Sequence, residues 1–207
     1  MYIPASFEQL DPDELQAFIE RHSFAALVSQ HDGQPLASQL PLHFKPDCGE
    51  QGCLVGHMAR ANPQWRQADG QTVLAMFTGP HAYISASWYE AQNVVPTWNY
   101  AAVHIYGRFE AIHDTPALLA IVREFVEFYE SGRSEPWQLP DDEFIERLTE
   151  SIVGFHIPID RIEGKWKLSQ NQPAERRQKV IAALERRSDE NSRAVAALMR
   201  SKASGGH

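Results

Sequence analysis

A succession of strand-like segments joined by short connections constrains this sequence more than any other feature. The segments are Phe24–Ser29, Leu36–Phe44, Cys53–Gly56, Thr72–Thr78, Ala82–Ser85, Val94–Thr97 and Ala101–Ile112. The first two are separated by HDGQ, in which Asp-Gly is a strong signal for a hairpin turn. Because consecutive strands with short turns pair in opposite directions, the pattern predicts an antiparallel sheet or barrel of about six strands.

Helical patterns flank these strands. Residues 12–22 follow a proline start and repeat apolar side chains at helical spacing. A wide apolar stripe from Thr115 to Tyr129 predicts a longer helix, and further helices are expected over residues 141–151 and from Pro173 onward. The predicted fold class is therefore mostly β with flanking helices, an α+β protein with helices at its C-terminus.

Charge is distributed unevenly along the 207 residues. The net charge is -8, which argues against a protein covered in nucleic acid. Residues 174–207 hold eight Lys/Arg and four Asp/Glu, a net of +4, so residues 1–173 carry -12. The basic C-terminal segment permits a local contact with an anionic partner but does not require one.

Signals for export or for a membrane are not visible in the sequence. The N-terminus, MYIPASFEQLD, lacks a basic start followed by an apolar run, and no stretch approaches the ~20 apolar residues that cross a bilayer. Cys48 and Cys53 are the only cysteines, so neither a disulfide framework nor a zinc site is expected. We expect a cytoplasmic protein without membrane contact.

The stretch Thr78–Gly107 concentrates aromatic rings beside small polar side chains. They are Tyr83, Trp88, Tyr89, Trp98, Tyr100 and Tyr106, with His81, Ser85, Ser87, Asn93, Thr97, Asn99 and His104 among them. A pocket for a flat heterocycle needs this mixture, because rings supply area and polar groups fix orientation. An aromatic-rich hairpin whose polar residues face water fits the same composition, and both interpretations stay open here.

A second candidate lies where the strand at Cys53–Gly56 runs into the start of a helix. Unpaired backbone N–H groups at a helix start attract an anion, and Arg60 can add a bidentate contact to a phosphate. The alternative is a surface arginine on an ordinary connection.

Four segments in this order resemble one known family. They are MYIPASF at the start, GHMARANPQW at 56–65, GPHAYISASWY through VPTWNYAAVHIYG at 79–107, and IEGKWKLSQN at 162–171. Together they resemble the PaiB-type family of FMN-binding negative transcriptional regulators, from Met1 to about Ala183. Two positions depart from the family pattern: Ala86 stands where proline is expected, and Gln172 where a basic residue is more usual.

The resemblance implies a six-stranded antiparallel FMN-binding split barrel that works as a homodimer, with the flavin near the subunit interface. It implies a split-barrel domain over residues 1–172 with inserted helices, followed by a helical tail over residues 173–207. The cofactor implied is FMN.

Each part of FMN makes a separate demand, and the resemblance together with these demands suggests the residues that bind it. For the phosphate we expect His57, Arg60 and Asn62, supplemented by Lys165 or Lys167. For the ring system the leading candidates are Thr97, Trp98 and Asn99, and Ser169, Gln170 and Asn171 could reach its polar edge from the partner subunit. The alternative for Lys165 and Lys167 is the solvated face of a strand.

Three classes of function remain. The first is an FMN-binding negative regulator of transcription, whose DNA contact would come from basic residues of the C-terminal helix. The second is a flavin-dependent oxidoreductase of the NAD(P)H:flavin reductase or oxidase type, since flavin carries its own redox chemistry and no protein nucleophile stands out. The third is a haem-binding split barrel, with His81, His104 and His156 as the conceivable axial ligands.

Overall fold

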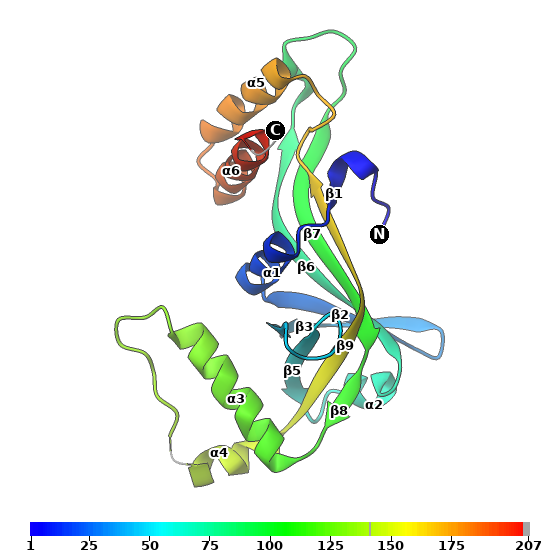
Figure 1. Ribbon diagram of the computed structural model, residues 1–207, viewed down its shortest axis with the longest axis vertical. Helices are drawn as coiled ribbons and strands as arrows, with labels where there is room; N and C mark the ends of the chain where they lie inside the picture. The colour runs from blue at the N-terminus through cyan, green and yellow to red at the C-terminus, as the bar shows by residue number, and fades with distance from the viewer. Residues whose placement is uncertain (141, 205–207) are drawn as a thin grey trace. The chain divides into compact units, whose positions relative to one another are not determined.

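Nine strands form one antiparallel sheet in the computed structural model, which describes residues 1–140 and 142–204 (Figure 1). In sheet order they are β3 (Gln34–Pro41), β2 (Phe24–His31), β6 (Thr72–Ile84), β7 (Thr97–Arg108), β9 (Ile152–Lys167), β5 (Cys53–Ala59) and β4 (His43–Lys45); β1 (Glu8–Gln9) and β8 (Glu110–Ile112) also pair with β9. The helices are α1 (Pro12–Arg21), α2 (Gln64–Ala68), α3 (Thr115–Glu130), α4 (Asp142–Thr149), α5 (Ala174–Glu185) and α6 (Glu190–Ser204), with 3₁₀ turns at Ala5–Phe7 (η1) and Ala86–Tyr89 (η2).

The predicted fold class, mostly β with flanking helices, is confirmed. The strand number is corrected, because short strands at β1, β4 and β8 raise it from six to nine among the described residues. The strands of the predicted split barrel form an open sheet, whose order begins at β3, ends at β4 and does not close.

Two compact units make up the chain. Unit 1 comprises residues 1–18, 78–103 and the described chain from 163 onward, and unit 2 comprises residues 19–77 and 104–162. Strands β6, β7 and β9 contribute residues to both units. The predicted division after residue 172 falls inside unit 1 and stays a prediction. Residues 205–207 of the predicted tail, and residue 141 of the predicted helix, lie outside the described residues.

The β2–β3 hairpin in unit 2 forms where Asp-Gly predicted a turn. Asp32 and Gly33 have φ angles of 49° and 76°, as two-residue turns of this kind require. The strands pair residue by residue from Phe24 opposite Pro41 to His31 opposite Gln34. A local signal in the sequence therefore sets the register of the whole hairpin.

Helix α3 packs against β5 in unit 2. Its buried residues Ile121 and Phe125 form one apolar cluster with Cys53 and Val55. Asp114 caps the helix, because its side chain accepts a hydrogen bond from the backbone N–H of Ala117 at 3.0 Å.

Cys48 and Cys53 form a disulfide, which the sequence analysis did not predict. They are five residues apart, and the antiparallel pairing of β4 with β5 places Lys45 opposite Cys53. The hairpin therefore returns the chain to the point where the two sulfur atoms meet. In the chain-entropy picture, closing so short a loop stabilises the folded state by ~2 kcal/mol.

Unit 1 has its own core. The indole of Trp166 on β9 packs against the Phe18 ring with centroids 4.8 Å apart. Helices α5 and α6 lie side by side (Figure 1), and both contribute buried apolar side chains, namely Val180, Ile181, Leu184, Val195 and Met199. The helices predicted from Pro173 onward therefore belong to a packed element of this unit.

Candidate functional site

Unit 1 contains a cavity of about 270 Å³ that gathers many of the predicted flavin-binding residues. Its lining consists of Phe7, Tyr89, Asn93, Val94, Val95, Thr97, Asn99, Lys167, Ser169, Asn171, Gln172 and Arg176. Five of these, Thr97, Asn99, Lys167, Ser169 and Asn171, were predicted from the sequence. Lys167 and Arg176 supply two cations, and no carboxylate is among the described residues that line the cavity. We call it the unit 1 cavity.

A buried polar network forms one wall of the unit 1 cavity. Asn99 is fully buried on β7, and its amide Nδ2 donates to the Ser169 hydroxyl at 3.0 Å. The same hydroxyl lies 3.4 Å from the Tyr89 hydroxyl. Ser169 has a φ of 62°, in the left-handed region, so the chain turns sharply after β9 and aims this hydroxyl inward. Buried polar groups need such partners, and the network fixes their orientation.

Lys167 brings a charge to the cavity. Its Nζ donates to the Thr97 hydroxyl and, at 2.6 Å, to the Trp98 carbonyl oxygen. Burial lowers the pKa of the Lys167 ammonium, and the neighbouring Lys165 lowers it further. Two hydrogen bonds thus hold the amine in place where its charge is poorly solvated, so an anionic or electron-rich group there is stabilised.

Three other predicted residues of unit 1 do not line this cavity. Gln170 closes its own turn, accepting from the Leu168 N–H at 2.7 Å and donating to the Trp166 carbonyl. Lys165 is buried, and its Nζ donates to the Tyr2 carbonyl at 2.9 Å. The side chain of Trp98 remains 53% exposed.

Exposed aromatic side chains surround Trp98 on this unit. The Tyr83 ring meets it edge-on with centroids 5.9 Å apart, and the His81 ring lies at 6.2 Å. Tyr83 is itself 48% exposed. The two interpretations of the aromatic stretch therefore both hold in part: Tyr83 and Trp98 face outward, while Tyr89 and Asn99 line a cavity.

Sequence reasoning missed several lining residues. Phe7, Gln172 and Arg176 come from the two ends of unit 1's chain, far from the aromatic stretch. Arg176 Nη1 donates to the Gln172 amide oxygen at 3.2 Å. The signal that could have found Arg176 is its position five residues after Asn171, one helical turn into a helix opened by proline.

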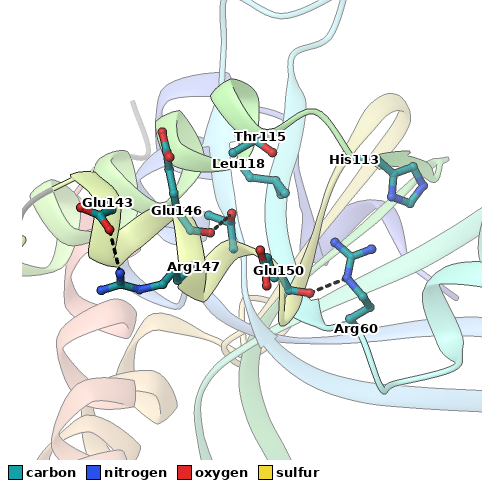
Figure 2. A pocket seen from close by; sticks show the side chains of 9 residues that line it. Arg60, His113, Thr115, Leu118, Glu143, Glu146, Arg147 and Glu150 are labelled. Carbon is teal, nitrogen blue, oxygen red and sulfur yellow. Dashed lines mark hydrogen bonds and ion pairs between the residues drawn. The ribbon is translucent and has the colours of Figure 1, made fainter.

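The predicted phosphate-binding residues His57, Arg60 and Asn62 belong to unit 2. Arg60 Nε donates to the Glu150 carbonyl at 2.7 Å (Figure 2). The Arg60 carbonyl accepts from the Trp65 indole at 3.0 Å. Asn62 shapes the turn that leads into α2, because its Oδ1 accepts a hydrogen bond from the Gln64 N–H at 3.0 Å. The strand does run into a helix start, as predicted, and Asn62 already has a structural role there.

Arg60 lines a second cavity, of about 340 Å³, which we call the unit 2 cavity (Figure 2). The other lining residues are His113, Thr115, Leu118, Glu143, Glu146, Arg147, Thr149 and Glu150. Arg147 is paired with Glu143 at 3.0 Å. Three carboxylates accompany two guanidinium groups here, whereas the described lining of the unit 1 cavity has cations and no carboxylate. The unit 2 cavity is therefore less favourable to a phosphate.

His57 lies on β5 with its ring edge-on to Phe125, at a centroid distance of 5.4 Å. Burial lowers the pKa of this imidazole. Its Nδ1 is buried and has no hydrogen-bond partner among the described residues. The His57 imidazole is therefore neutral and packs against the apolar side of α3, so it is a weak candidate for binding an anion.

The histidines considered as haem ligands are divided between the units. His81 belongs to unit 1, whereas His104 and His156 belong to unit 2. His156 Nε2 is 2.8 Å from a Glu110 carboxylate oxygen. No group of three or more metal-ligating side chains occurs among the residues that the structure describes. Likewise, none of the described helices is long and apolar enough to cross a membrane. The cytoplasmic location stays a prediction.

Comparison with known proteins identifies the family. Residues 1–161 match the family described as "Putative FMN-binding domain". The chain is 39% identical over 206 residues to the protease synthase and sporulation protein PAI 2 of Bacillus subtilis (strain 168), covering 98% of both proteins.

Two solved structures have a similar fold at low sequence identity. The FAD and heme binding protein from Mycobacterium smegmatis gives a TM-score of 0.61 at 16% identity, covering 85% of this chain and 79% of that one. The flavocytochrome Anf3 from Azotobacter vinelandii gives 0.60 at 18% identity, covering 77% and 69%. These likenesses confirm the fold class. The family match and the Bacillus relative confirm the resemblance found in the sequence: the chain belongs to the PaiB-type family of FMN-binding domain proteins.

Proposed function

We propose that this protein binds FMN and that the unit 1 cavity holds the polar edge of the flavin ring. The observation that carries the proposal is the convergence of Lys167, Asn171 and the Asn99–Ser169 pair on one cavity, whose described lining residues include no carboxylate. The pyrimidine edge of a flavin presents two carbonyl oxygens on either side of an N–H group. An ammonium, amides and a hydroxyl are the partners that such an edge requires.

The size of the cavity supports a contact with one end of the cofactor. Pockets that enclose a drug-sized ligand measure ~300–1,000 Å³. The unit 1 cavity, at about 270 Å³, lies below that range. It is therefore suited to part of FMN, with the remainder covered by other protein surface.

A titration of the purified protein tests this proposal. The visible spectrum of protein purified without added cofactor should show a flavin, and the released chromophore should be FMN. In the apoprotein, Lys167→Gln should weaken the binding of FMN and of riboflavin by the same factor, about tenfold or ~1.4 kcal/mol. The reason is that the substitution removes a charged hydrogen-bond donor to the flavin ring. Lys179→Gln is the matched control, since Lys179 is a lysine of the same unit that does not line the cavity.

The same titration tests the predicted phosphate contact of Arg60 separately. Riboflavin lacks only the phosphate, so a phosphate ligand reveals itself by a loss confined to FMN. If Arg60 contacts the phosphate, Arg60→Gln should lower the affinity for FMN and leave the affinity for riboflavin unchanged. Equal affinity of wild type and Lys167→Gln for both ligands would contradict the proposal for the unit 1 cavity.

We further propose that the protein acts as a negative regulator of transcription, as its family resemblance implies. In the C-terminal segment several basic residues are paired with carboxylates: Lys179 with Glu90 and Glu175, Arg187 with Asp189, Arg200 with Glu185, and Lys202 with Glu14. These pairs reduce the charge that the helices offer to DNA phosphates. A gel mobility assay across a salt series decides: retardation with a steep salt slope supports direct binding, and no retardation at low salt excludes it.

A further inference from the structure

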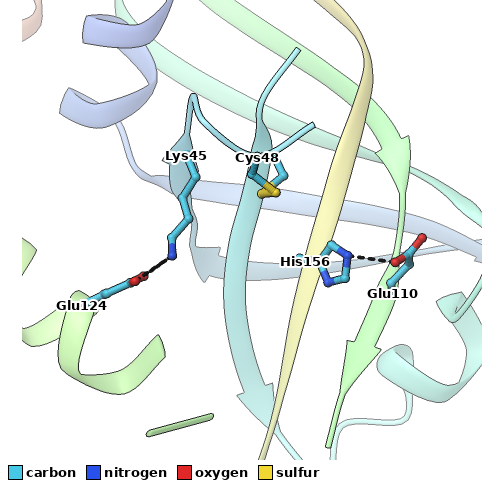
Figure 3. The surroundings of a disulfide bond; sticks show 6 residues. Lys45, Cys48, Glu110, Glu124 and His156 are labelled. Carbon is cyan, nitrogen blue, oxygen red and sulfur yellow. Dashed lines mark hydrogen bonds and ion pairs between the residues drawn. A yellow bond between two sulfur atoms is a disulfide. The ribbon is translucent and has the colours of Figure 1, made fainter. Parts of the chain in front are cut away.

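The Cys48–Cys53 disulfide forms part of the wall of a cavity in unit 2 (Figure 3). The cavity measures about 350 Å³. Its lining residues are Lys45, Cys48, Cys53, Val55, Ile112, Ala117, Ala120, Ile121, Glu124 and His156. It therefore offers space for a small molecule beside these two cysteines.

The two cysteines differ in exposure. Cys48 lies in the loop between β4 and β5 and is half-buried, whereas Cys53 is 1% exposed at the start of β5. Cys53 also packs in the apolar cluster with Val55, Ile121 and Phe125. An attacking thiolate consequently reaches the sulfur of Cys48 more easily, which makes Cys53 the leaving group.

Charged groups line the same cavity. Lys45 Nζ donates to Glu124 at 2.7 Å, and His156 Nε2 lies 2.8 Å from a Glu110 carboxylate oxygen (Figure 3). A nearby cation stabilises a thiolate and makes it a better leaving group. Lys45, the cross-strand partner of Cys53, supplies that cation, and Glu124 partly offsets it.

From this arrangement we infer that Cys48 and Cys53 are a reversible thiol–disulfide exchange site for small monothiols, in the folded protein. A monothiol thiolate attacks Cys48 Sγ, the bond between the two protein sulfurs breaks, and its electron pair leaves with Cys53. A second monothiol thiolate attacks the small-molecule sulfur of the mixed disulfide, and the electron pair of the broken bond leaves with Cys48. The protein disulfide gains two electrons and two protons, and two monothiols become one small disulfide. This inference does not depend on the proposed flavin site.

Exchange changes the connection between β4 and β5. The disulfide closes the loop Cys48–Cys53, and reduction removes this constraint from a hairpin that pairs only three residues of each strand. Cys53 packs in one apolar cluster with Ile121 and Phe125 of α3. A change in the redox state of the cysteine pair should therefore alter the packing of α3 in the unit 2 core.

The experiment uses the full chain in mixtures of reduced and oxidised glutathione, without denaturant. After an acid quench, the protein is unfolded and its thiols are labelled with a polyethylene glycol maleimide, so that a gel counts them. We expect the count to pass from zero to two as reduced glutathione increases and to return when oxidised glutathione is restored, with the circular dichroism of the helices retained throughout. Thiols that appear only at denaturant concentrations that unfold the protein would overturn the inference.

Variants test the direction of attack and the role of charge. With oxidised glutathione, Cys48 in Cys53→Ala should form the mixed disulfide about tenfold faster than Cys53 does in Cys48→Ser, since reactivity follows exposure. Glu124→Gln leaves Lys45 uncompensated and should speed reduction of the disulfide, whereas Lys45→Gln should slow it. Equal rates for the two single-cysteine variants, or no opposite effect of the two charge variants, would overturn the proposed route.

Discussion

Asn99 illustrates how part of the aromatic stretch comes to line a cavity. A fully buried amide without partners would destabilise the fold by ~1–3 kcal/mol. Asn99 avoids this cost because Nδ2 donates to the Ser169 hydroxyl at 3.0 Å and contacts the Met199 sulfur at 3.5 Å. Local sequence patterns could not predict these partners, because Ser169 and Met199 are 70 and 100 residues from Asn99 in the sequence.

His57 should make the protein less stable in mild acid. Burial lowers its pKa below the usual 6.5, so the unfolded chain binds the proton more readily than the folded one. Folding stability therefore falls as the pH drops through about 6.5 toward the lowered value. His22 acts in the same direction, because burial and the nearby Arg21 lower its pKa as well.

Urea unfolding at pH 7.5 and 5.5 checks this expectation. The loss of unfolding free energy between the two pH values should be smaller in His57→Gln than in wild type. His31→Gln, at the exposed end of β2, controls for removing an imidazole. An identical pH dependence in wild type and His57→Gln would show that His57 does not carry the effect.

Gly154 on β9 allows α3 to pack closely against the sheet. A Cβ built at Gly154 on β9 would lie 2.7 Å from Leu118 Cδ2, so an alanine there pushes on a buried α3 side chain. We expect Gly154→Ala to lower the unfolding free energy by ~1–3 kcal/mol, as overpacked cores do. Gly132→Ala is the matched control, because a Cβ there meets nothing within 4 Å. Thermal unfolding of the two variants should differ accordingly, and equal melting temperatures would rule out this close approach.

Element boundaries were predictable where the signal was local and not where it depended on distant partners. Asp32-Gly33 specified the β2–β3 turn because the left-handed φ angles it needs are a property of those two residues. The short strand β1 gave no such signal, since its two residues become a strand only by pairing with β9. The Cys48–Cys53 disulfide was missed for the same reason: the β4–β5 register, not the cysteine count, brings the sulfurs together.

At the scale of the whole molecule, the family resemblance predicted more of the candidate site than composition and periodicity did. Of the predicted residues, Thr97, Asn99, Lys167, Ser169 and Asn171 share one cavity. Composition alone could not have joined residues 97–99 to residues 167–171, because only the pairing of β7 with β9 brings them together. Arg176 completed that lining from beyond the segments that carried the resemblance.

The homodimer stays a prediction, and its link to FMN can be measured. A cavity of about 270 Å³ accepts only part of the cofactor, so we expect a second subunit to cover the rest. If so, FMN must strengthen self-association by the same factor by which self-association strengthens FMN binding. Sedimentation over a protein dilution series should show dimers persisting to lower concentration with FMN than without it. Riboflavin in place of FMN shows whether the phosphate contributes to this coupling. A monomer that binds FMN with one affinity at every dilution would contradict the dimeric site and leave the unit 1 cavity to act within a single chain.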